Sequence, residues 1–258
     1  MVMISIITAC YNQGNFLKEA FASVELDKYK DVFEYIVVND GSTDEETIRI
    51  FKELENLGVK IIHQQNKGLG AARNAGIKMS KGKYILPLDS DNKIDPKIMI
   101  EAAQKMEQNE KINVVYTDAK YFGTKNDDWI VGEFSMPKML FCNFIDACSL
   151  IRKSMLDEDN CYDGDMPAMG HEDWELWVRI GLTKKGFYYF RKFGFYYRVR
   201  EDSMSATISN PNFIRNRQYI YNKHATLIAE YMRSLAQEKG IKKFITRSKN
   251  FARRIIKN

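Results

Sequence analysis

The first half of the chain alternates short, mostly apolar runs, rich in β-branched residues, with amphipathic stretches. The apolar runs predict buried strands at residues 2–8, 33–38, 59–63 and 84–88. The amphipathic stretches predict helices, one with apolar residues at helical spacing from Phe16 to Val24. Another opens on Thr43 and Glu46, which have the spacing of a capping box. Strands that alternate with helices through short loops indicate an α/β fold with a parallel sheet and right-handed crossovers.

Polar or glycine-rich residues follow each of these four predicted strands. The third predicted helix opens on Gly68, and the fourth follows Asp95 with Pro96 at its first position. Because the carboxyl ends of parallel strands lie at the same edge of a sheet, the four loops are expected to meet there. That edge is the predicted ligand site.

The second half of the chain is less regular. Aromatic and β-branched runs predict further strands at residues 114–122, 129–133, 148–152, 187–190 and 195–199. Helices are expected at 137–144 and from His171, where acids fill the first turn and the helix dipole favours them. From Asn212 onward the pattern is helical. These features predict one domain at residues 1–206 and a helical C-terminal extension at 207–258.

Composition is that of a soluble globular protein, with 45% hydrophobic and 28% charged residues. The net charge of +5 is concentrated in residues 241–258, which hold seven Lys or Arg and no acid, so the rest is slightly acidic. Apolar residues recur at helical spacing between these basic ones. That pattern is typical of a helix lying on an anionic membrane surface. A basic helix packed on the body, or a frayed terminus, would show the same composition.

Four cysteines without a Cys-x-x-Cys pair and only three histidines argue against a structural zinc site and favour reduced thiols. The N-terminus has neither a basic region nor a long apolar core, so no signal peptide is expected. No apolar run approaches the roughly 20 residues that span a bilayer. We therefore expect a cytoplasmic protein, peripheral on the inner face of the plasma membrane if the basic tail docks there.

The most informative stretch for chemistry is Asp89-Ser90-Asp91, which directly follows the fourth predicted strand. Two carboxylates at the carboxyl end of a strand suit a hard divalent cation such as Mn²⁺ or Mg²⁺. Such a cation takes oxygen ligands and bridges to substrate phosphates. An isolated Asp-x-Asp is also common in turns that cap a following helix, so the motif alone does not decide.

Other short motifs share the chain with this one, in a fixed order. They are Thr8-Ala9-Cys10-Tyr11-Asn12, Val38-Asn39-Asp40-Gly41-Ser42-Thr43-Asp44, Asn66-Lys67-Gly68 through Arg73-Asn74, Asp89-Ser90-Asp91, Glu172-Asp173-Trp174, and Tyr197-Arg198 followed by Ser203-Met204-Ser205. With these motifs the chain resembles an inverting glycosyltransferase of family 2 from about residue 3 to 206. The resemblance implies a GT-A fold, with a mostly parallel central sheet flanked by helices.

The resemblance also implies a role for each matching position. The residues expected to bind the nucleotide sugar are Thr8, Tyr11, Asp40, Arg73, Asp89, Ser90 and Arg200. The expected metal ligands are Asp91 and Asp89. Asp173 is the expected general base, with Glu172 as its catalytic neighbour.

The chemistry of an inverting transfer fits these assignments. One carboxylate must take the proton from the acceptor hydroxyl, and a cation must neutralise the leaving diphosphate. Asp173 at a helix start and the acids at a strand end meet these two needs. A retaining hydrolase would instead need a carboxylate pair flanking the scissile bond, and the sequence indicates no such pair.

One position departs from the family pattern. Many relatives carry a His two residues after the Tyr-Arg pair, where it completes the metal shell, and here Arg200 stands in that place. A guanidinium cannot bind a cation but can hold diphosphate oxygens, so we expect Arg200 to clamp the diphosphate. The third metal ligand is then open, with His171 or water as the candidates.

Three other functions fit the sequence less well. Residues 68–70 have the outline of a dinucleotide-binding turn, but Arg73 replaces the third Gly and the stretch follows the third strand. A relative that binds nucleotide sugars without transferring them would lack Asp173 or a metal acid. A nucleic-acid binder would interleave aromatic and basic residues, whereas the tail has only Phe244 and Phe251.

The sequence therefore predicts a metal-dependent inverting glycosyltransferase of hexosyltransferase type. The expected donor is a nucleoside-diphosphate sugar, with UDP favoured over GDP or dTDP. The expected acceptor is a hydroxyl of a glycan or lipid-linked glycan in surface polysaccharide synthesis. No nucleic-acid partner is expected, and an anionic membrane surface is the partner expected for residues 241–258.

Overall fold

The computed structural model describes residues 3–156, 161–183, 186–200 and 211–238. The predicted domain boundary near residue 206, the Ser203-Met204-Ser205 motif and the basic tail lie outside these ranges. The strands are β1 (Ile4–Cys10), β2 (Phe33–Asp40), β3 (Lys60–Gln64), β4 (Tyr84–Pro87), β5 (Lys93–Ile94), β6 (Ile112–Gly123), β7 (Asp128–Trp129), β8 (Leu150–Arg152) and β9 (Gly186–Val199). The helices are α1 (Gly14–Ser23), α2 (Leu26–Tyr29), α3 (Glu45–Asn56), α4 (Leu69–Met79), α5 (Pro96–Gln108), α6 (Met136–Phe141), α7 (Glu172–Leu182), α8 (Pro211–Lys223) and α9 (Ala225–Glu238).

Within the described residues, nine strands form one sheet in the order β3-β2-β1-β4-β8-β6-β9-β5, with β7 paired to β6. Strands β3, β2, β1 and β4 are parallel, as predicted, so their carboxyl ends share one edge. Strand β8 runs antiparallel to both β4 and β6. Because of this reversal, the start of β8 and the loop before it lie at the same edge. The predicted α/β fold is confirmed.

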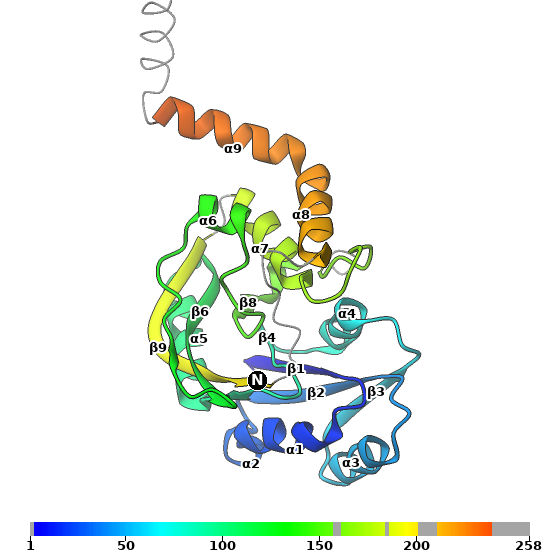
Figure 1. Ribbon diagram of the computed structural model, residues 1–258. Helices are drawn as coiled ribbons and strands as arrows, with labels where there is room; N and C mark the ends of the chain where they lie inside the picture. Colours follow the sequence, from blue (N-terminus) through cyan, green and yellow to red (C-terminus); the bar gives the residue numbers. More distant parts are fainter. Residues whose placement is uncertain (1–2, 157–160, 184–185, 201–210, 239–258) are drawn as a thin grey trace, which may run out of the picture.

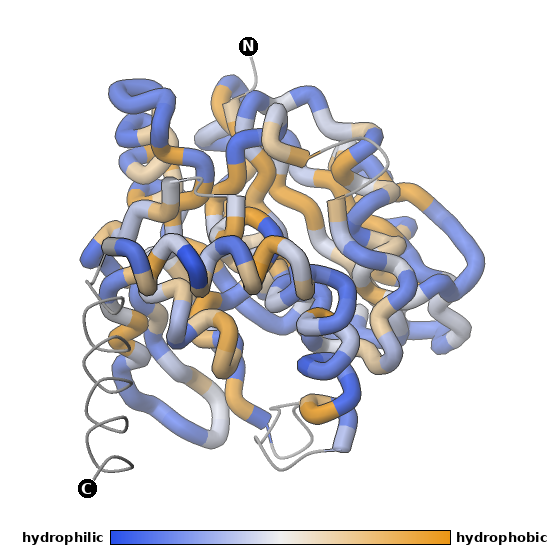
Figure 2. Tube along the Cα trace, turned by 90° about the horizontal axis from the view of Figure 1, so that it is seen from above, coloured by the Kyte–Doolittle hydropathy of each residue, from blue (hydrophilic) through white to orange (hydrophobic). Residues whose placement is uncertain are grey.

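Helices cover both faces of the sheet, and side chains alternate between the two cores that result (Figure 1). On β1, Ile4 and Ile6 belong to the core under α1, α3 and α5, whereas Ile7 belongs to the core that also contains residues of α4, α6, α7 and α8. This is the two-residue period of a strand buried on both faces. Figure 2 shows hydrophobic stretches running through the middle of the molecule between more hydrophilic loops.

Helix α4 packs unusually close to the sheet. A Cβ atom on Gly76 would collide with the Cγ2 atom of Ile7 on β1. The absence of a side chain at this position lets α4 approach β1 and β2, so that its first turn lies against the carboxyl edge.

Several local predictions need correction. The N-cap of α3 is Asp44, whose side chain accepts from the Thr47 amide at 2.8 Å, not Thr43. The amide of Thr43 instead donates to Asn12 Oδ1 at 2.8 Å, because the loop after β2 is tied to the loop after β1. The two aromatic runs at 187–190 and 195–199 form the single strand β9, which pairs with β6 through register shifts. The expected strand at 129–133 is reduced to β7, and the short elements α2 and β5 were not predicted.

Helices α8 and α9 are anchored on the body by a buried carboxylate. Glu175 on α7 is fully buried, its Oε1 lying 2.7 Å from His224 Nε2 and 3.2 Å from Lys223 Nζ. Arg179 also bonds to it within α7 at 3.2 Å. Burial raises the pKa of Glu175, but the His224 hydrogen bond and the charges of Arg179 and Lys223 outweigh it and hold that pKa below its usual value. In the described part of the chain, no helix combines the length and the apolar character needed to cross a bilayer.

Candidate active site

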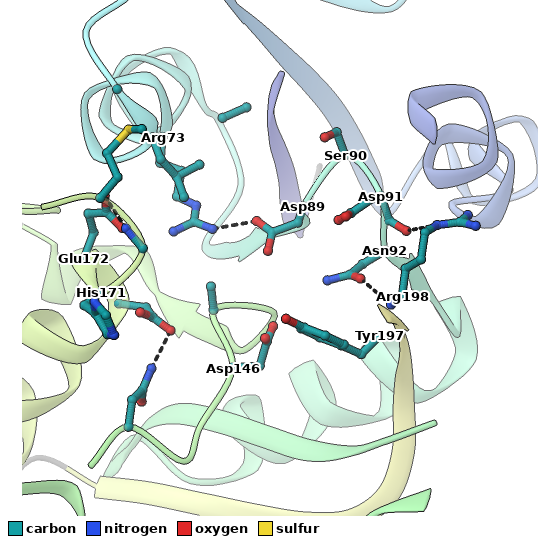
Figure 3. A pocket seen from close by; sticks show the side chains of 18 of the residues that line it. Arg73, Asp89, Ser90, Asp91, Asn92, Asp146, His171, Glu172, Tyr197 and Arg198 are labelled. Carbon is teal, nitrogen blue, oxygen red and sulfur yellow. Dashed lines mark hydrogen bonds and ion pairs between the residues drawn. The ribbon is translucent and has the colours of Figure 1, made fainter. Parts of the chain in front are cut away.

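A cavity of about 780 Å³ opens at the carboxyl edge of the parallel strands. Loops from both halves of the chain line it, as Figure 3 shows. Sequence-predicted residues that line it are Tyr11, Asp40, Arg73, Asp89, Ser90, Asp91, Glu172, Asp173 and Arg200. Residues that separate sequence motifs predicted to share one site therefore line the same cavity.

Asp40 at the end of β2 orders one end of this cavity. Its Oδ1 accepts from Gln64 Nε2 at 2.7 Å and from the Lys67 amide at 2.9 Å, and its Oδ2 accepts from the Gly68 amide at 2.9 Å. The next residue, Gly41, has a φ of 78°, and a Cβ there would lie 2.7 Å from the Asn66 backbone nitrogen. Asp40 thus fixes the loop that leads into α4, and it also lines the cavity.

Thr8 does not reach this cavity. Its side chain is fully buried, and its Oγ1 accepts from the Tyr35 hydroxyl at 3.0 Å. The expectation that Thr8 holds the nucleoside is not supported, because the side chain at this position of β1 points into the core. Tyr11, which follows the strand, is half exposed and lines the cavity.

Asp89 is held by a buried arginine. Arg73 Nη2 donates to Asp89 Oδ1 at 2.6 Å, and the guanidinium also lies over the ring of Tyr162, 5.2 Å from its centroid. Burial opposes the charge on Arg73, but Asp89 and other neighbouring groups outweigh it and raise the pKa of Arg73 above its usual value. The Asp89 side chain keeps 33% of its surface exposed, so it is oriented without being enclosed.

Asp91 is more deeply placed and carries an unfavourable charge. Burial, and then repulsion from Asp89, raises the pKa of Asp91 to about 6, although Arg200 opposes this shift from 3.5 Å. Arg198 braces the same turn, because its Nε donates to the Asp91 carbonyl at 2.9 Å and its amide donates to Asn92 Oδ1 at 2.9 Å. A carboxylate destabilised in this way gains from a nearby cation.

Among the described residues, no group of three His, Cys, Asp or Glu side chains could hold a metal ion by itself. Mg²⁺ and related ions in phosphate sites use one or two carboxylates together with substrate phosphates and water. The donor set of Asp89 and Asp91 fits that arrangement.

His171 is not the missing metal ligand. The Asn216 amide on α8 exchanges two hydrogen bonds with the Ala168 backbone, at 2.8 and 3.0 Å, which fixes its orientation. Its Nδ2 then donates to His171 Nδ1 at 2.9 Å, so the proton of a neutral His171 resides on Nε2. Neither ring nitrogen offers a free lone pair, and His171 lies across the cavity from Asp91 (Figure 3).

Asp173 lies in the first turn of α7 and is held through both oxygens. Oδ1 accepts from the Trp174 amide and Oδ2 from Asn143 Nδ2, each at 2.8 Å. Burial raises the pKa of Asp173 to about 6, against the opposing effects of Arg73 and Asn143. Its raised pKa makes this carboxylate more basic than an ordinary aspartate, which suits a group that takes up a proton. Its neighbour Glu172 is buried and accepts from the Gly170 amide at 3.0 Å, which gives it a structural contact.

Sequence reasoning missed two polar residues in the loop before β8, Asn143 and Asp146. Both line the cavity, and the loop is pinned from α7, since Trp177 Nε1 donates to the Ile145 carbonyl at 3.1 Å. The sequence could have indicated these two residues only indirectly, through the position of β8 in the sheet. An antiparallel β8 beside β4 would have placed the start of β8 at the ligand edge.

The sequence profile described as Glycosyl transferase family 2 matches residues 5–168, well over half of the chain. The chain belongs to glycosyltransferase family 2. The match includes the motifs from β1 to β4 and the loop that carries Asn143 and Asp146, and the acids of α7 lie just beyond it.

Curated relatives of this family 2 member align over most of its length. An Escherichia coli protein named UDP-Glc:alpha-D-GlcNAc-diphosphoundecaprenol beta-1,3-glucosyltransferase WfaP is 31% identical over 216 residues, covering 80% of this chain and 81% of the relative. Glycosyltransferase GlyG of Streptococcus pneumoniae is 29% identical over 216 residues, covering 74% of this chain and 71% of GlyG.

Solved structures support the fold. Residues 1–349 of S. aureus TarS, in complex with UDP-GlcNAc, superpose with a TM-score of 0.69 at 23% identity. The alignment covers 85% of this chain and 65% of the TarS chain, so this chain spans about two thirds of that structure's length. The predicted GT-A fold is confirmed. The dinucleotide-binding alternative is not supported, since Arg73 pairs with Asp89 in a family 2 framework.

Proposed function

We propose that this family 2 glycosyltransferase moves a sugar, with inversion, from a UDP-sugar to a hydroxyl of a lipid-linked glycan acceptor. The observation that carries the proposal is the placement of Asp173, a partly buried carboxylate of raised pKa, in the same cavity as Asp89 and Asp91. The name of the E. coli relative supports UDP-glucose as a donor and a diphosphoundecaprenol-linked acceptor of this class. The UDP-GlcNAc complex of TarS supports a UDP-sugar.

In this proposal one end of the cavity binds the nucleotide and the other activates the acceptor. Tyr11 and Asp40 hold the nucleoside, and Arg73 keeps Asp89 oriented toward the diphosphate. Asp173 takes the proton from the acceptor hydroxyl as that oxygen attacks the anomeric carbon. Inversion follows, because the nucleophile arrives on the side opposite the leaving diphosphate.

A bound Mn²⁺ or Mg²⁺ would neutralise the negative charge that develops on the leaving diphosphate. Asp91 and Asp89 are the residues proposed to hold it, with the diphosphate oxygens and water as further ligands. Arg200, beside Asp91, is proposed to clamp the diphosphate itself. In relatives with a His at this position, that contact would instead go to the cation.

The direct test is a transfer assay with the full chain. UDP release is measured with UDP-glucose, UDP-galactose and UDP-GlcNAc, a synthetic lipid-diphosphate GlcNAc acceptor, and Mn²⁺, Mg²⁺ or EDTA. We expect metal-dependent release, and a product whose anomeric configuration in NMR is opposite to that of the donor. Tight UDP-sugar binding without any turnover would instead indicate a relative that has lost transfer.

The metal assignment has a separate readout. UDP with Mn²⁺ should raise the thermal unfolding temperature of the wild type above the value with UDP alone. In Asp91→Ala this metal-dependent increment should vanish. An increment that persists in the variant would remove Asp91 from the metal site, whatever the result of the transfer assay.

A further inference from the structure

Asp146 lies in the cavity without a role in the proposed chemistry. It belongs to the loop between α6 and β8, and its Oδ1 accepts from the Cys148 amide at 2.8 Å. The Trp177 hydrogen bond to the adjacent Ile145 carbonyl holds the loop in place. The carboxyl group therefore has a fixed orientation rather than that of a free loop side chain.

The second oxygen of this carboxyl group has no hydrogen-bond partner in the described ranges of the chain. The side chain lines the cavity and, in Figure 3, points from the floor of the cavity toward Asp89, with Tyr197 beside it. An acid in this position is costly unless it gains a partner, because it is partly buried among other acids. Burial, followed by the charges of Asp89 and Asp173, raises the pKa of Asp146, and both of these acids line the same cavity.

The position of Asp146 in the cavity determines which part of a bound donor its side chain can contact. In an inverting transfer the anomeric carbon lies between the leaving diphosphate and the attacking acceptor oxygen. Asp89 belongs to the diphosphate end and Asp173 to the acceptor end. A group that faces the space between them meets the ring of the sugar in transfer.

We propose that Asp146 binds a hydroxyl of the transferred sugar through its second carboxylate oxygen and thereby selects among donor sugars. This inference rests on the proposed function and adds to it the residue that reads the sugar. A site that hydrogen-bonds a particular hydroxyl discriminates strongly against a sugar in which that hydroxyl is absent or turned away. Epimers that share the same UDP are then distinguished here rather than at the nucleotide.

The test uses Asp146→Asn, which preserves the shape of the side chain. The Cys148 amide still requires an acceptor, so Oδ1 of the new Asn stays toward it and the NH₂ group replaces the cavity oxygen. An acceptor that faces the sugar thus becomes a donor, while the loop bond is retained. Affinities for UDP, UDP-glucose, UDP-galactose and UDP-GlcNAc are measured by calorimetry with Mn²⁺.

We expect unchanged UDP affinity, and for the preferred UDP-sugar a loss of about tenfold or more, as for a hydrogen bond to a charged group. The spread of affinities across the three sugars should narrow. Asp127→Asn, an exposed acid outside the cavity, is the matched control and should change neither value. Asp146→Ser, which keeps an oxygen for the Cys148 amide, replaces the first variant if that one unfolds.

Three results would overturn the inference. Equal losses for UDP and UDP-sugars would assign Asp146 to the metal and diphosphate. Unchanged donor affinities with a raised KM for the acceptor would assign it to the acceptor. Unchanged selectivity would remove it from recognition altogether. A wild type that binds UDP but no UDP-sugar would be a different result, because it would overturn the proposed function and this inference with it.

Discussion

At the scale of single residues, the environment of Asp173 sets its basicity. Burial raises its pKa, whereas Arg73 and the Asn143 hydrogen bond favour the charged form and limit the rise to about 6. A general base works best when its pKa lies close to the working pH. Two hydrogen bonds also fix the carboxylate in one orientation, so that its remaining lone pairs can face the acceptor.

Replacing the base should separate transfer from binding. We expect Asp173→Asn to lower the transfer rate about 10²–10⁴-fold, as expected when a positioned base is removed. UDP affinity should stay close to the wild-type value, since Asp173 is proposed to face the acceptor and not the nucleotide. Steady-state kinetics and calorimetry on the same preparation give both numbers. Near-normal transfer by this variant would move the role to Glu172 or to another group.

The hydrogen bond from Asn143 predicts the direction in which the pKa of Asp173 should change. Its amide donates to the ionised form of Asp173, so Asn143→Ala removes a contact that lowers the pKa of Asp173. The carboxyl group must be deprotonated to accept a proton, so activity is lost as pH falls through its pKa. We therefore expect the acid limb of kcat/KM, near pH 6 in the wild type, to move to higher pH in the variant. A limb that stays in place or moves down would show that Asn143 does not act through Asp173.

The motifs predicted nine of the cavity residues because local sequence fixes their place. Acids at the end of a buried strand, or just after it, must lie at its carboxyl edge, as Asp40 and Asp89 do. Thr8 was misplaced because it lies two residues before the end of β1, where the alternation of side chains decides which face it meets. Asn143 and Asp146 were missed because their position depends on the pairing of β8 with β4, and nothing in the loop itself encodes that pairing.

At the scale of elements, the same distinction separates what was predicted of the fold from what was not. The parallel strands β1 to β4 follow from short local patterns with helices between them. Strand β9 was predicted as two strands, because Arg191 and Lys192 interrupt its aromatic pattern and only the pairing with β6 shows that the strand continues. The minor strands β5 and β7 are two residues long and exist through their partners alone.

The anchor of α8 and α9 on Glu175 predicts a large effect on stability. Glu175→Ala leaves Lys223 and His224 without their buried partner, and breaking a buried pair in this way typically costs about 3–5 kcal/mol of unfolding free energy. Chemical denaturation measures it. The matched control is Glu133→Ala, which breaks the exposed pair with Arg191 and should change stability little, because water screens a surface ion pair. Equal effects of the two variants would show that the Glu175 cluster does not anchor these helices.

The cluster also makes stability depend on pH. The folded-state pKa of Glu175 is lowered, so its contribution is present above its unfolded pKa and is lost as pH falls through the folded value. Below about pH 4, the ordinary pKa of Glu, the wild type should therefore lose stability faster than Glu175→Gln. Parallel acid-unfolding curves would contradict this assignment.

At the scale of the whole molecule, charge is distributed unevenly. The body is slightly acidic, and the excess of positive charge lies in residues 241–258, beyond the described part of the chain. We propose that these residues bind an anionic membrane surface, where the proposed lipid-linked acceptor resides. Each Lys or Arg close to such a surface contributes on the order of 1 kcal/mol.

Liposome flotation tests this proposal. The full chain should float with vesicles containing anionic lipid at low salt and be released at high salt, because screening weakens the attraction. A chain ending at Gly240 should remain in the soluble fraction, and neutral vesicles serve as the control for both. If the two chains behave alike, the basic residues pack on the body or contact another protein.

The hydrogen bonds from the α7 tryptophans have a consequence for how such enzymes diversify. Trp174 Nε1 donates to the Met139 carbonyl at 2.7 Å and Trp177 Nε1 to the Ile145 carbonyl at 3.1 Å. Residues 136–182 therefore carry Asn143, Asp146 and Asp173 together with the groups that hold them in place. With the roles proposed for these residues, a gene exchange confined to this segment would change sugar and acceptor specificity together. The nucleotide half, encoded upstream, could then be inherited unchanged by enzymes that build different glycans.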